Sequence, residues 1–457
     1  MSTSATTTNS TLRFTQSQIK SFVVNLVLVM SFFPYFKILP IDANIQPFCG
    51  LVAFAMLSVY GFVLDNSARM LLGFLVVLLG YTLVAVVLGF SFSAIIQNFA
   101  YLMPILTYTA LKDNLDRVSG RAILACIKIY LVTGILQTVG ILGPIASALH
   151  FDALIPGFSG TSLGSVRGVT FVASEPSYAS YIIFEMLAVA LCFYHRGVLT
   201  SKQMRFAAYA VGAMVLMNKS STGMVLMLTF AAGYGLHLFM LIEPKRRTRL
   251  FLSGLATTII GVPLLIFLVA LLADKVRFLE TLRVLTSVEL WQAGWQNALA
   301  LIGGKRFVTV YVGYASMFVN AGFGHGIGSY QSVFSEVSKQ VGVDFSTLTA
   351  LMEGERNATA LKPDAYGAAI ALDTGWMGLV ALGLFLRSVI RGRRGALPAD
   401  TKVAAIRSGL FVAAVFQILM DTPTSIPVAW VVLALVYAGF TGPSAEHTPS
   451  SAGLAQS

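Results

Sequence analysis

The stretch 164–180 contains Arg167 and Glu175 just before a long apolar run. A guanidinium group binds phosphate oxygens through paired hydrogen bonds, so we expect Arg167 to bind a phosphate or diphosphate. Glu175 precedes Pro176, an order that is also typical of a helix start, because proline suits the first turn and a carboxylate the positive end. Glu175 is therefore either a helix-start residue or a site carboxylate that accepts a proton or holds Arg167. Tyr178 belongs to the same candidate substrate-binding stretch.

A second candidate site surrounds Lys219, which is followed by Ser220, Ser221 and Thr222. A lysine beside three hydroxyl groups at a helix start forms a small anion-binding corner. The alternative is a lysine at the end of a membrane span whose ammonium group reaches back to the interface. Both interpretations stay open at this point.

A long polar insertion, 274–366, interrupts the apolar sequence and carries further candidates. Lys305 and Arg306 form either a second phosphate clamp or a solvated pair. Arg283 is a further candidate cation, and Asp364 lies near the end of the insertion. Functional residues of a membrane protein commonly gather in such a segment, because loops carry function while the spans hold them in place.

The insertion also contains the densest glycine pattern of the chain, around His325, which reads Gly-Phe-Gly-His-Gly-Ile-Gly over 322–328. The spacing differs from that of a phosphate-binding loop, and no strand–turn–helix unit surrounds it. We expect the glycines to allow a tight backbone turn near a ligand. His325 is then either a structural residue or an active-site residue.

The sequence contains no cluster of His, Cys and carboxylates with the spacing of a metal site. We therefore expect a metal-independent site and no cofactor. The three cysteines, Cys49, Cys126 and Cys192, all fall in apolar runs, so no disulfide framework is expected.

The composition identifies an integral membrane protein. Of the 457 residues, 56% are hydrophobic and 11% charged, and the mean hydropathy is +0.78, whereas soluble domains carry about 25% charged residues. The net charge of +11 does not indicate nucleic-acid binding, because the cations are scattered through short loops between apolar runs. We predict an all-α polytopic protein with about twelve transmembrane helices.

The predicted organisation has five parts: a cytoplasmic tail (1–20), nine spans (21–273) with an outer loop (144–176), the large outer loop (274–366), three spans (367–441) and a second tail (442–457). The expected spans are 21–40, 47–65, 69–90, 92–111, 122–143, 177–195, 203–218, 220–242, 250–273, 367–388, 404–421 and 425–441. With both termini in the cytoplasm, most of the 31 lysines and arginines face the cytoplasm. The short outer loops then hold only Lys37, Arg167 and Lys219.

Two further segments have specific expectations. The apolar positions of 276–295 follow a helical stripe, and we expect either an amphipathic helix on the outer interface or a helix packed on the bundle. Glu185 lies in the middle of a predicted span, where a carboxyl group is costly unless it is paired or hydrated.

Three stretches occur in the order typical of one family. They are Arg167 followed by Glu-Pro-Ser, then Ser-Thr-Gly at 221–223, then the long loop that ends with Pro-Asp-Ala-Tyr at 363–366 and Asp-Thr-Gly-Trp at 373–376. In this the chain resembles the bacterial O-antigen polymerases (Wzy type) and O-antigen ligases. The resemblance covers most of the chain and implies a glycosyltransferase of the multi-span, GT-C-like kind in the bacterial inner membrane.

Such enzymes use undecaprenyl-diphosphate-linked oligosaccharides at the periplasmic face. A polymerase joins repeat units into O-antigen or exopolysaccharide, whereas a ligase transfers the finished polysaccharide to lipid A–core. Ligases usually carry His-Asn where this chain has Asp364 and Ala365, which favours a polymerase with Asp364 or Glu175 as the base. Ser221 stands where the family has arginine, with Lys219 as a substitute, and Arg283 lies farther from Trp291 than the corresponding family arginine.

The resemblance thus implies a polysaccharide polymerase acting on lipopolysaccharide or exopolysaccharide repeat units, with membrane lipid around it. A chain-length regulator (a polysaccharide co-polymerase) and a flippase are the protein partners that it implies. The alternatives are an O-antigen ligase and, in another class, a transporter of lipid-linked sugar. Transporters typically show repeated halves and broken helices, and we find no convincing internal repeat.

Overall fold

The computed structural model describes residues 15–35, 46–87, 89, 91–142, 168–248, 295–343, 363–392 and 400–440. These ranges contain helices and no strands, as expected for an all-α protein. The helices are α1 (Gln16–Phe32), α2 (Gln46–Tyr60), α3 (Asn66–Val87), α4 (Ser91–Lys112), η1 (Leu115–Arg117), α5 (Gly120–Thr138), α8 (Pro176–His195), α9 (Ser201–Asn218), α10 (Ser221–Leu241), α14 (Trp295–Val319), α15 (Tyr330–Gln340), α17 (Tyr366–Arg391), α18 (Thr401–Phe416), η4 (Gln417–Asp421) and α19 (Val428–Ala438).

Seven helices in the described ranges are long and apolar enough to cross a membrane. Helices also coincide with the other predicted spans, although α1, α2, α9 and α19 fall short in length or hydropathy. The predicted span 250–273 lies outside the described residues. Several long apolar helices identify a multi-pass membrane protein.

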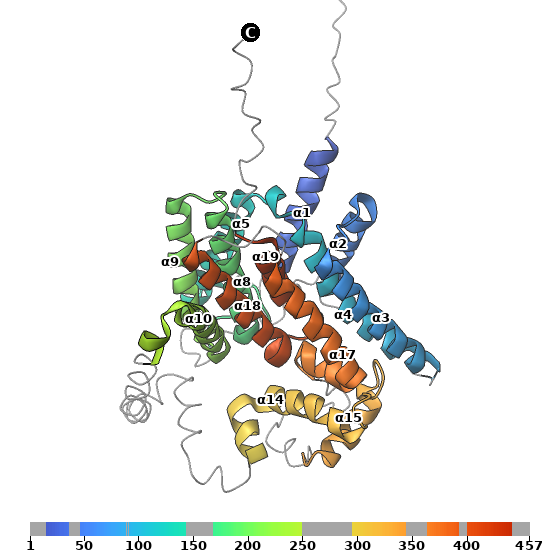
Figure 1. Cartoon of the computed structure of the whole chain (residues 1–457). Coiled ribbons are helices and arrows are strands. Elements are labelled where there is room, and N and C mark those ends of the chain that lie inside the picture. The colour runs from blue at the N-terminus through green and yellow to red at the C-terminus, as the bar shows by residue number, and fades with distance from the viewer. Residues whose placement is uncertain are drawn as a thin grey trace, which may run out of the picture.

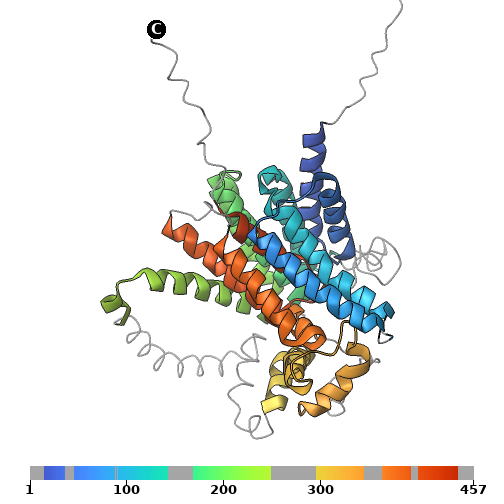
Figure 2. The same cartoon turned by 45° about the vertical axis from the view of Figure 1, so that its right-hand side comes forward.

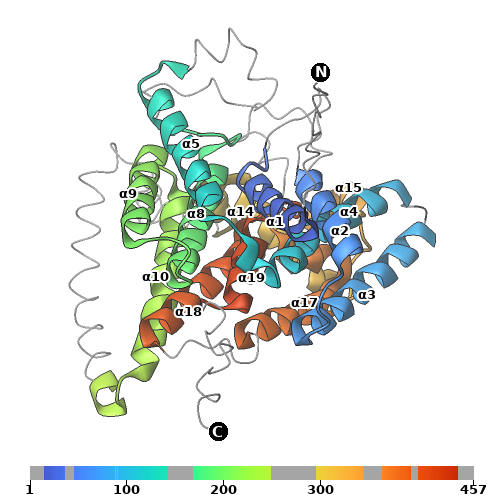
Figure 3. The same cartoon turned by 90° about the horizontal axis from the view of Figure 1, so that it is seen from above.

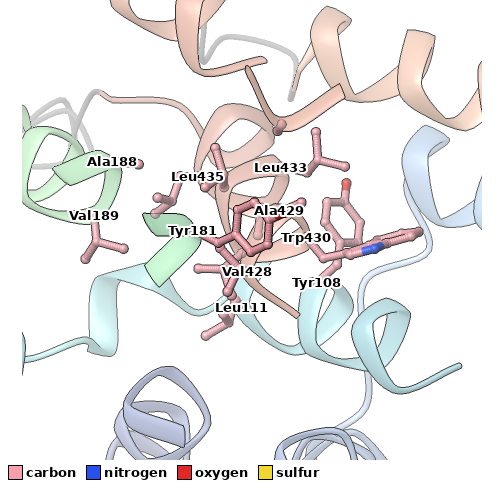
Figure 4. Close-up of a cluster of buried hydrophobic side chains, with 14 of the residues drawn as sticks. Tyr108, Leu111, Tyr181, Ala188, Val189, Val428, Ala429, Trp430, Leu433 and Leu435 are labelled. Atoms are coloured by element: carbon pink, nitrogen blue, oxygen red, sulfur yellow. The ribbon is translucent and has the colours of Figure 1, made fainter. Parts of the chain in front are cut away.

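The short helix α19 forms the centre of the bundle. It packs against α4, α8, α17 and α18, and in the view of Figure 3 it lies between α5 and α8–α10 on one side and α1–α4 with α17 on the other. Every residue from Val428 to Tyr437 is buried. Trp430 stacks on Phe385 and meets Tyr108 and Tyr366 edge to face, within the cluster drawn in Figure 4.

In contrast to the buried helix α19, α3 has an exposed apolar face, which is formed by Val76, Leu79, Leu83 and Val87. Contiguous exposed aliphatic side chains are rare on soluble monomers. On a helix of this hydropathy they are typical of a surface covered by lipid tails.

The two ends of the bundle differ in charge. The first end contains the start of α1, the end of α8 and the starts of α9 and α18, and the cations that gather there are Lys112, Arg117, Arg121, Arg196, Lys202, Arg205 and Lys402. Arg196, just after α8, connects two other segments at this end, because it pairs with Asp116 and donates to the carbonyl of Gly439 at 3.0 Å. We call it the cationic end. The opposite end contains the start of α8, the end of α9 and the start of α17.

The described part of the 274–366 insertion is helical and packs on that opposite end. α14 and α15 lie below the bundle in Figures 1 and 2, next to the start of α17, and α14 packs on α17 and η4. The insertion is therefore docked on the bundle over 295–343. The predicted amphipathic helix, 276–295, lies outside the described residues except for Trp295, which opens α14.

The glycine-rich segment 322–328 fills a break in α17. Gly375 interrupts that helix with φ 61° and ψ −145°, a conformation that is essentially restricted to glycine. Backbone N–H groups of His325 and Gly326 donate to the carbonyls of Leu372 and Asp373 at 2.8 and 2.9 Å. The glycine pattern thus satisfies carbonyl groups that the broken helix leaves without partners.

Candidate functional site

The first turn of α8 presents Glu175 at the end of the bundle opposite the cationic end. Glu175 occupies the residue before the helix, with Pro176 in the first turn, but its side chain makes no capping hydrogen bond to the helix. The carboxylate instead accepts a hydrogen bond from the Ser177 hydroxyl at 3.1 Å, and its side chain is 57% exposed. The helix-start interpretation holds for the backbone of Glu175, while its carboxylate is available to a site.

Arg306 of α14 lies beside this carboxylate. Its Nη2 atom is 3.7 Å from Glu175 Oε2, and its Nη1 atom is 3.2 Å from Asp421 Oδ1. Nη1 also donates to the Tyr181 hydroxyl at 3.2 Å, and the guanidinium lies 5.0 Å from the centre of the Tyr178 ring. Arg306 is therefore the residue around which the site is organised, and it is no solvated surface cation.

The environment of Arg306 favours its charged form. Burial alone would lower its pKa, but Tyr181, Asp421, Tyr178 and Asp364 together raise the pKa above the usual arginine value. The guanidinium consequently remains a permanent positive charge among acidic groups.

Asp421 was not among the residues predicted from the sequence. It ends η4, a π-helical turn that continues α18, and such turns are frequent at functional sites. The Thr422 N–H closes that turn on the carbonyl of Gln417 at 2.7 Å, and the Tyr181 hydroxyl donates to the Asp421 carbonyl at 2.7 Å. An acidic residue directly followed by Thr-Pro at the end of an apolar run was the available sequence signal.

Asp364 reaches the same cluster from the segment before α17. Its backbone N–H donates to the Thr309 hydroxyl at 3.4 Å, one turn from Arg306 in α14. Its half-buried carboxylate acts electrostatically on both Arg306 and Tyr178. The structure thus brings together four of the predicted site residues, which are Glu175, Tyr178, Arg306 and Asp364.

Three tyrosines line the cluster. Tyr35, just beyond α1, stacks on Tyr178 with ring centres 4.9 Å apart, and Tyr178 meets Tyr181 at 6.1 Å. Tyr35 and Tyr181 are buried and Tyr178 is partly exposed. We call the set of Tyr35, Glu175, Tyr178, Tyr181, Arg306, Asp364 and Asp421 the Arg306 cluster.

Lys219 lies near the cluster without a described contact to it. It ends α9 in a left-handed conformation and its side chain is exposed. Its neighbour Asn218 is buried and donates to the Pro176 carbonyl at 2.9 Å, while Ser180 donates to the Asn218 amide oxygen at 2.6 Å. The loop that carries Lys219 is therefore fixed to the first turn of α8, where Glu175 is presented.

His325 belongs to a different part of the protein. It lies in the glycine-rich segment at the break in α17, and none of the described contacts of Arg306 involves it. Burial lowers the pKa of His325, although Glu336 and a hydrogen bond to the Ser316 backbone oppose this shift. The structure therefore does not bring His325 to the contacts of Arg306, and its role as an active-site residue stays a prediction.

Three predicted residues receive no placement. Arg167 and Arg283 lie outside the described residues, and for Lys305 only the backbone, in α14, is described. Their predicted roles as phosphate ligands stay predictions. Within the described ranges no group of His, Cys, Asp and Glu is arranged to hold a metal ion.

Chemically, the Arg306 cluster combines carboxylates with one fixed cation and aromatic faces. Carboxylates accept hydrogen bonds from hydroxyl groups and can take a proton from one of them. The exposed Glu175 and the half-buried Asp364 give this chemistry access from outside the bundle. No protein-family model matches the chain, and no curated protein matches it in sequence.

Proposed function

We propose that this protein is a membrane glycosyltransferase that polymerises undecaprenyl-diphosphate-linked oligosaccharide repeat units. The product is O-antigen or exopolysaccharide, made at the periplasmic face of the bacterial inner membrane. The proposal includes about twelve spans in a GT-C-like arrangement, with both termini in the cytoplasm.

One observation carries the proposal. Glu175, Tyr178 and Asp364 meet around Arg306, although they come from segments far apart in the sequence. All four residues were predicted from the sequence as substrate-binding or catalytic residues. A cluster of charged groups at the edge of a membrane domain is costly to maintain and usually marks function. Glu175 and Asp364 lie in two of the stretches that resemble the polymerase and ligase family, Glu-Pro-Ser at 175–177 and Pro-Asp-Ala-Tyr at 363–366.

In the proposed reaction, a hydroxyl of the acceptor sugar attacks the anomeric carbon of the donor chain. A new glycosidic C–O bond forms, and the bond between the anomeric carbon and the diphosphate oxygen breaks. The electron pair of that bond leaves with undecaprenyl diphosphate, and the acceptor proton moves to a carboxylate. Glu175 and Asp364 are the candidate bases, because both belong to the Arg306 cluster and neither is fully buried.

The charge difference between the ends supports the proposed orientation. Positive residues near spans favour the cytoplasmic side, so the cationic end would face the cytoplasm. The Arg306 cluster would then face the periplasm, where lipid-linked repeat units are polymerised. The polyprenyl tails would enter sideways, along exposed apolar faces such as that of α3.

The test is complementation in a host whose own copy of the gene is deleted. The polysaccharide would be separated by size on a gel for wild type, Arg306→Ala, Glu175→Gln and Asp364→Asn. Arg205→Ala is the matched control, since this exposed arginine lies at the cationic end. We expect a ladder for wild type and for the control, and no ladder for Arg306→Ala.

The pattern of products separates the candidate functions. A deletion strain that still attaches a single repeat unit to its carrier has lost a polymerase. A strain that accumulates long lipid-linked polysaccharide without attaching it has lost a ligase. A strain that retains repeat units on the cytoplasmic face has lost a transporter, and this result would refute the glycosyltransferase proposal.

A further inference from the structure

We infer that the Arg306 cluster binds the sugar of the acceptor and not the diphosphate of the donor. This inference deepens the proposed function and rests on it. It changes the role expected of Arg306 from the sequence, where Lys305 and Arg306 were a candidate phosphate clamp. It also assigns Tyr35, Tyr181 and Asp421 to substrate binding.

The charges of the cluster disfavour a diphosphate. Arg306 is the only cation among the described side chains of the cluster, and it faces the carboxylates Glu175, Asp364 and Asp421. Its Nη atoms are already directed at Glu175, Asp421 and Tyr181. A diphosphate placed here would meet more negative than positive charge, and like charges repel each other.

The same groups suit a sugar. A pyranose ring has a face of C–H groups that packs on an aromatic ring and an edge of hydroxyls that donate to carboxylates. Tyr178 is partly exposed, and its ring is positioned by Tyr35, 4.9 Å away, and by the Arg306 guanidinium, 5.0 Å away. Binding sites commonly combine such rigid aromatic surfaces with a few fixed polar groups.

A second, independent observation points to a missing ligand. The Tyr35 side chain is only 4% exposed, and its hydroxyl has no hydrogen-bond partner among the described residues. This hydroxyl lies within the electrostatic reach of Arg306 and Glu175. A buried hydroxyl without a partner is costly, and a ligand hydroxyl bound between Tyr35 and Glu175 would satisfy it.

The diphosphate is then assigned to the neighbouring loop. Gly168, which follows Arg167 in the chain, has a positive φ and packs against the backbone of Asn218, which precedes Lys219. The loop that carries Lys219, a predicted phosphate ligand, is therefore held beside the start of α8. Donor and acceptor sites would lie next to each other, as the transfer requires.

The test measures binding of two probes to the purified full-length protein in detergent micelles. One probe is the host's repeat-unit oligosaccharide released from its diphosphate by mild acid, and the other is inorganic pyrophosphate. The variants are Tyr35→Phe, Tyr178→Ala, Asp421→Asn and Arg306→Ala. Tyr108→Phe is the matched control, because Tyr108 is a buried tyrosine near the cationic end.

We expect Tyr35→Phe, Tyr178→Ala and Asp421→Asn to weaken oligosaccharide binding about tenfold, as for the loss of one strong contact, and Tyr108→Phe to leave it unchanged. Tyr35→Phe should not lower the unfolding temperature, because it removes a hydroxyl with no described partner. This combination separates a binding role from a merely structural one. Pyrophosphate binding should be unaffected in these variants.

The inference fails if Asp421→Asn strengthens pyrophosphate binding and Arg306→Ala abolishes it, since Arg306 would then be a diphosphate ligand. It also fails if the Tyr35 and Tyr178 variants bind the oligosaccharide as wild type does. These outcomes can be told apart from a failure of the proposed function. A polymer ladder without sugar binding at the cluster refutes only the inference, whereas sugar binding without a ladder refutes only the polymerase.

Discussion

Arg306 and Asp421 are 115 positions apart in the sequence, yet their side chains pair at 3.2 Å where η4 ends against α14. Both side chains are largely buried, with 19% and 15% of their surfaces exposed. The pair therefore joins the polar insertion to the membrane bundle. Folding of the bundle and assembly of the candidate site are consequently linked through the ion pairs of Arg306.

Removal of either partner should be costly, and not equally so. Arg306→Ala leaves Asp421, Glu175 and Asp364 without their shared cation, and we expect a loss of about 3 kcal/mol in the free energy of unfolding. Asp421→Asn keeps a hydrogen-bond acceptor and should cost less. Unfolding by SDS in mixed micelles measures both values, with Arg205→Ala as the control. Equal and negligible losses would show that the pair does not stabilise the docked insertion.

The sequence predicted only part of this cluster, for a physical reason. Glu175, Tyr178, Arg306 and Asp364 could be singled out because charges and aromatic residues beside apolar runs are conspicuous. Asp421 and Tyr181 were missed, because one ends a predicted span and the other lies within one, and residue type alone does not show which face of a helix they occupy. The π-helical turn that directs Asp421 toward Arg306 has no recognisable sequence signal.

A buried lysine at the cationic end provides a test by pH. Lys112 pairs with Asp65, in the turn before α3, at 2.6 Å, and with Asp113 at 2.7 Å. Burial raises the pKa of Asp65. Hydrogen bonds from Lys112, the Ala68 N–H and Ser67 lower it by more than burial raises it, so the pKa lies below the usual value of 3.8. The folded state thus binds this proton less readily than the unfolded state.

The sign of the pH effect follows from that shift. A carboxyl group whose pKa is lower in the folded state than in the unfolded state stabilises the folded protein at pH values above the unfolded-state pKa. This stabilisation is lost as the pH falls through the folded-state pKa. The unfolding temperature of wild type should therefore fall on acidification below about pH 4, and Asp65→Asn should remove part of that slope. Asp400→Asn is the control, because Asp400 is an exposed capping residue. Identical slopes in wild type and Asp65→Asn would contradict the assignment.

The break in α17 predicts a sharp difference between two glycines of one helix. A Cβ atom at Gly375 would lie 2.0 Å from the Gly322 carbonyl oxygen, whereas a Cβ atom at Gly383 meets nothing within 4 Å. Gly375→Ala should cost about 3 kcal/mol or more, from backbone strain and loss of the docked glycine-rich segment. Gly383→Ala should be neutral or stabilising by up to about 1 kcal/mol.

SDS unfolding measures both glycine variants, and limited proteolysis between α14 and α15 reports on the docked segment. Faster cleavage in Gly375→Ala and unchanged cleavage in Gly383→Ala are the expected results. If Gly375→Ala were as stable as wild type, the glycine-rich segment would not depend on the break in α17.

This segment also shows what sequence patterns leave undetermined. The glycines at 322–328 correctly predicted a tight turn, since Gly322, Gly324, Gly326 and Gly328 all have positive φ. The segment packs on the broken helix α17, and the expected ligand near the turn stays a prediction. A local pattern predicts backbone conformation, whereas the partner of that backbone depends on long-range packing that no single stretch encodes.

Glu185 places a carboxyl group in the middle of α8. Its side chain is fully buried, and its Oε1 atom lies 2.6 Å from the hydroxyl of Ser31. The same hydroxyl is 2.6 Å from the carbonyl of Leu28. The Ser31 hydroxyl has a single hydrogen, which it can donate to the Leu28 carbonyl. The short contact with Glu185 is then a hydrogen bond only if a protonated Glu185 donates to the Ser31 oxygen.

Glu185 is then neutral, which avoids the cost of an unpaired charge inside the membrane domain. Glu185→Gln should retain the fold to within about 1 kcal/mol, because the amide also donates to Ser31. Glu185→Lys should abolish it, because it introduces a buried cation without a counter-ion. The infrared carbonyl band of a protonated carboxylic acid should be present in wild type and reduced in Glu185→Gln. If wild type and Glu185→Gln differed only in the infrared bands of an ionised carboxylate, Glu185 would be ionised in wild type and Ser31 would donate to it.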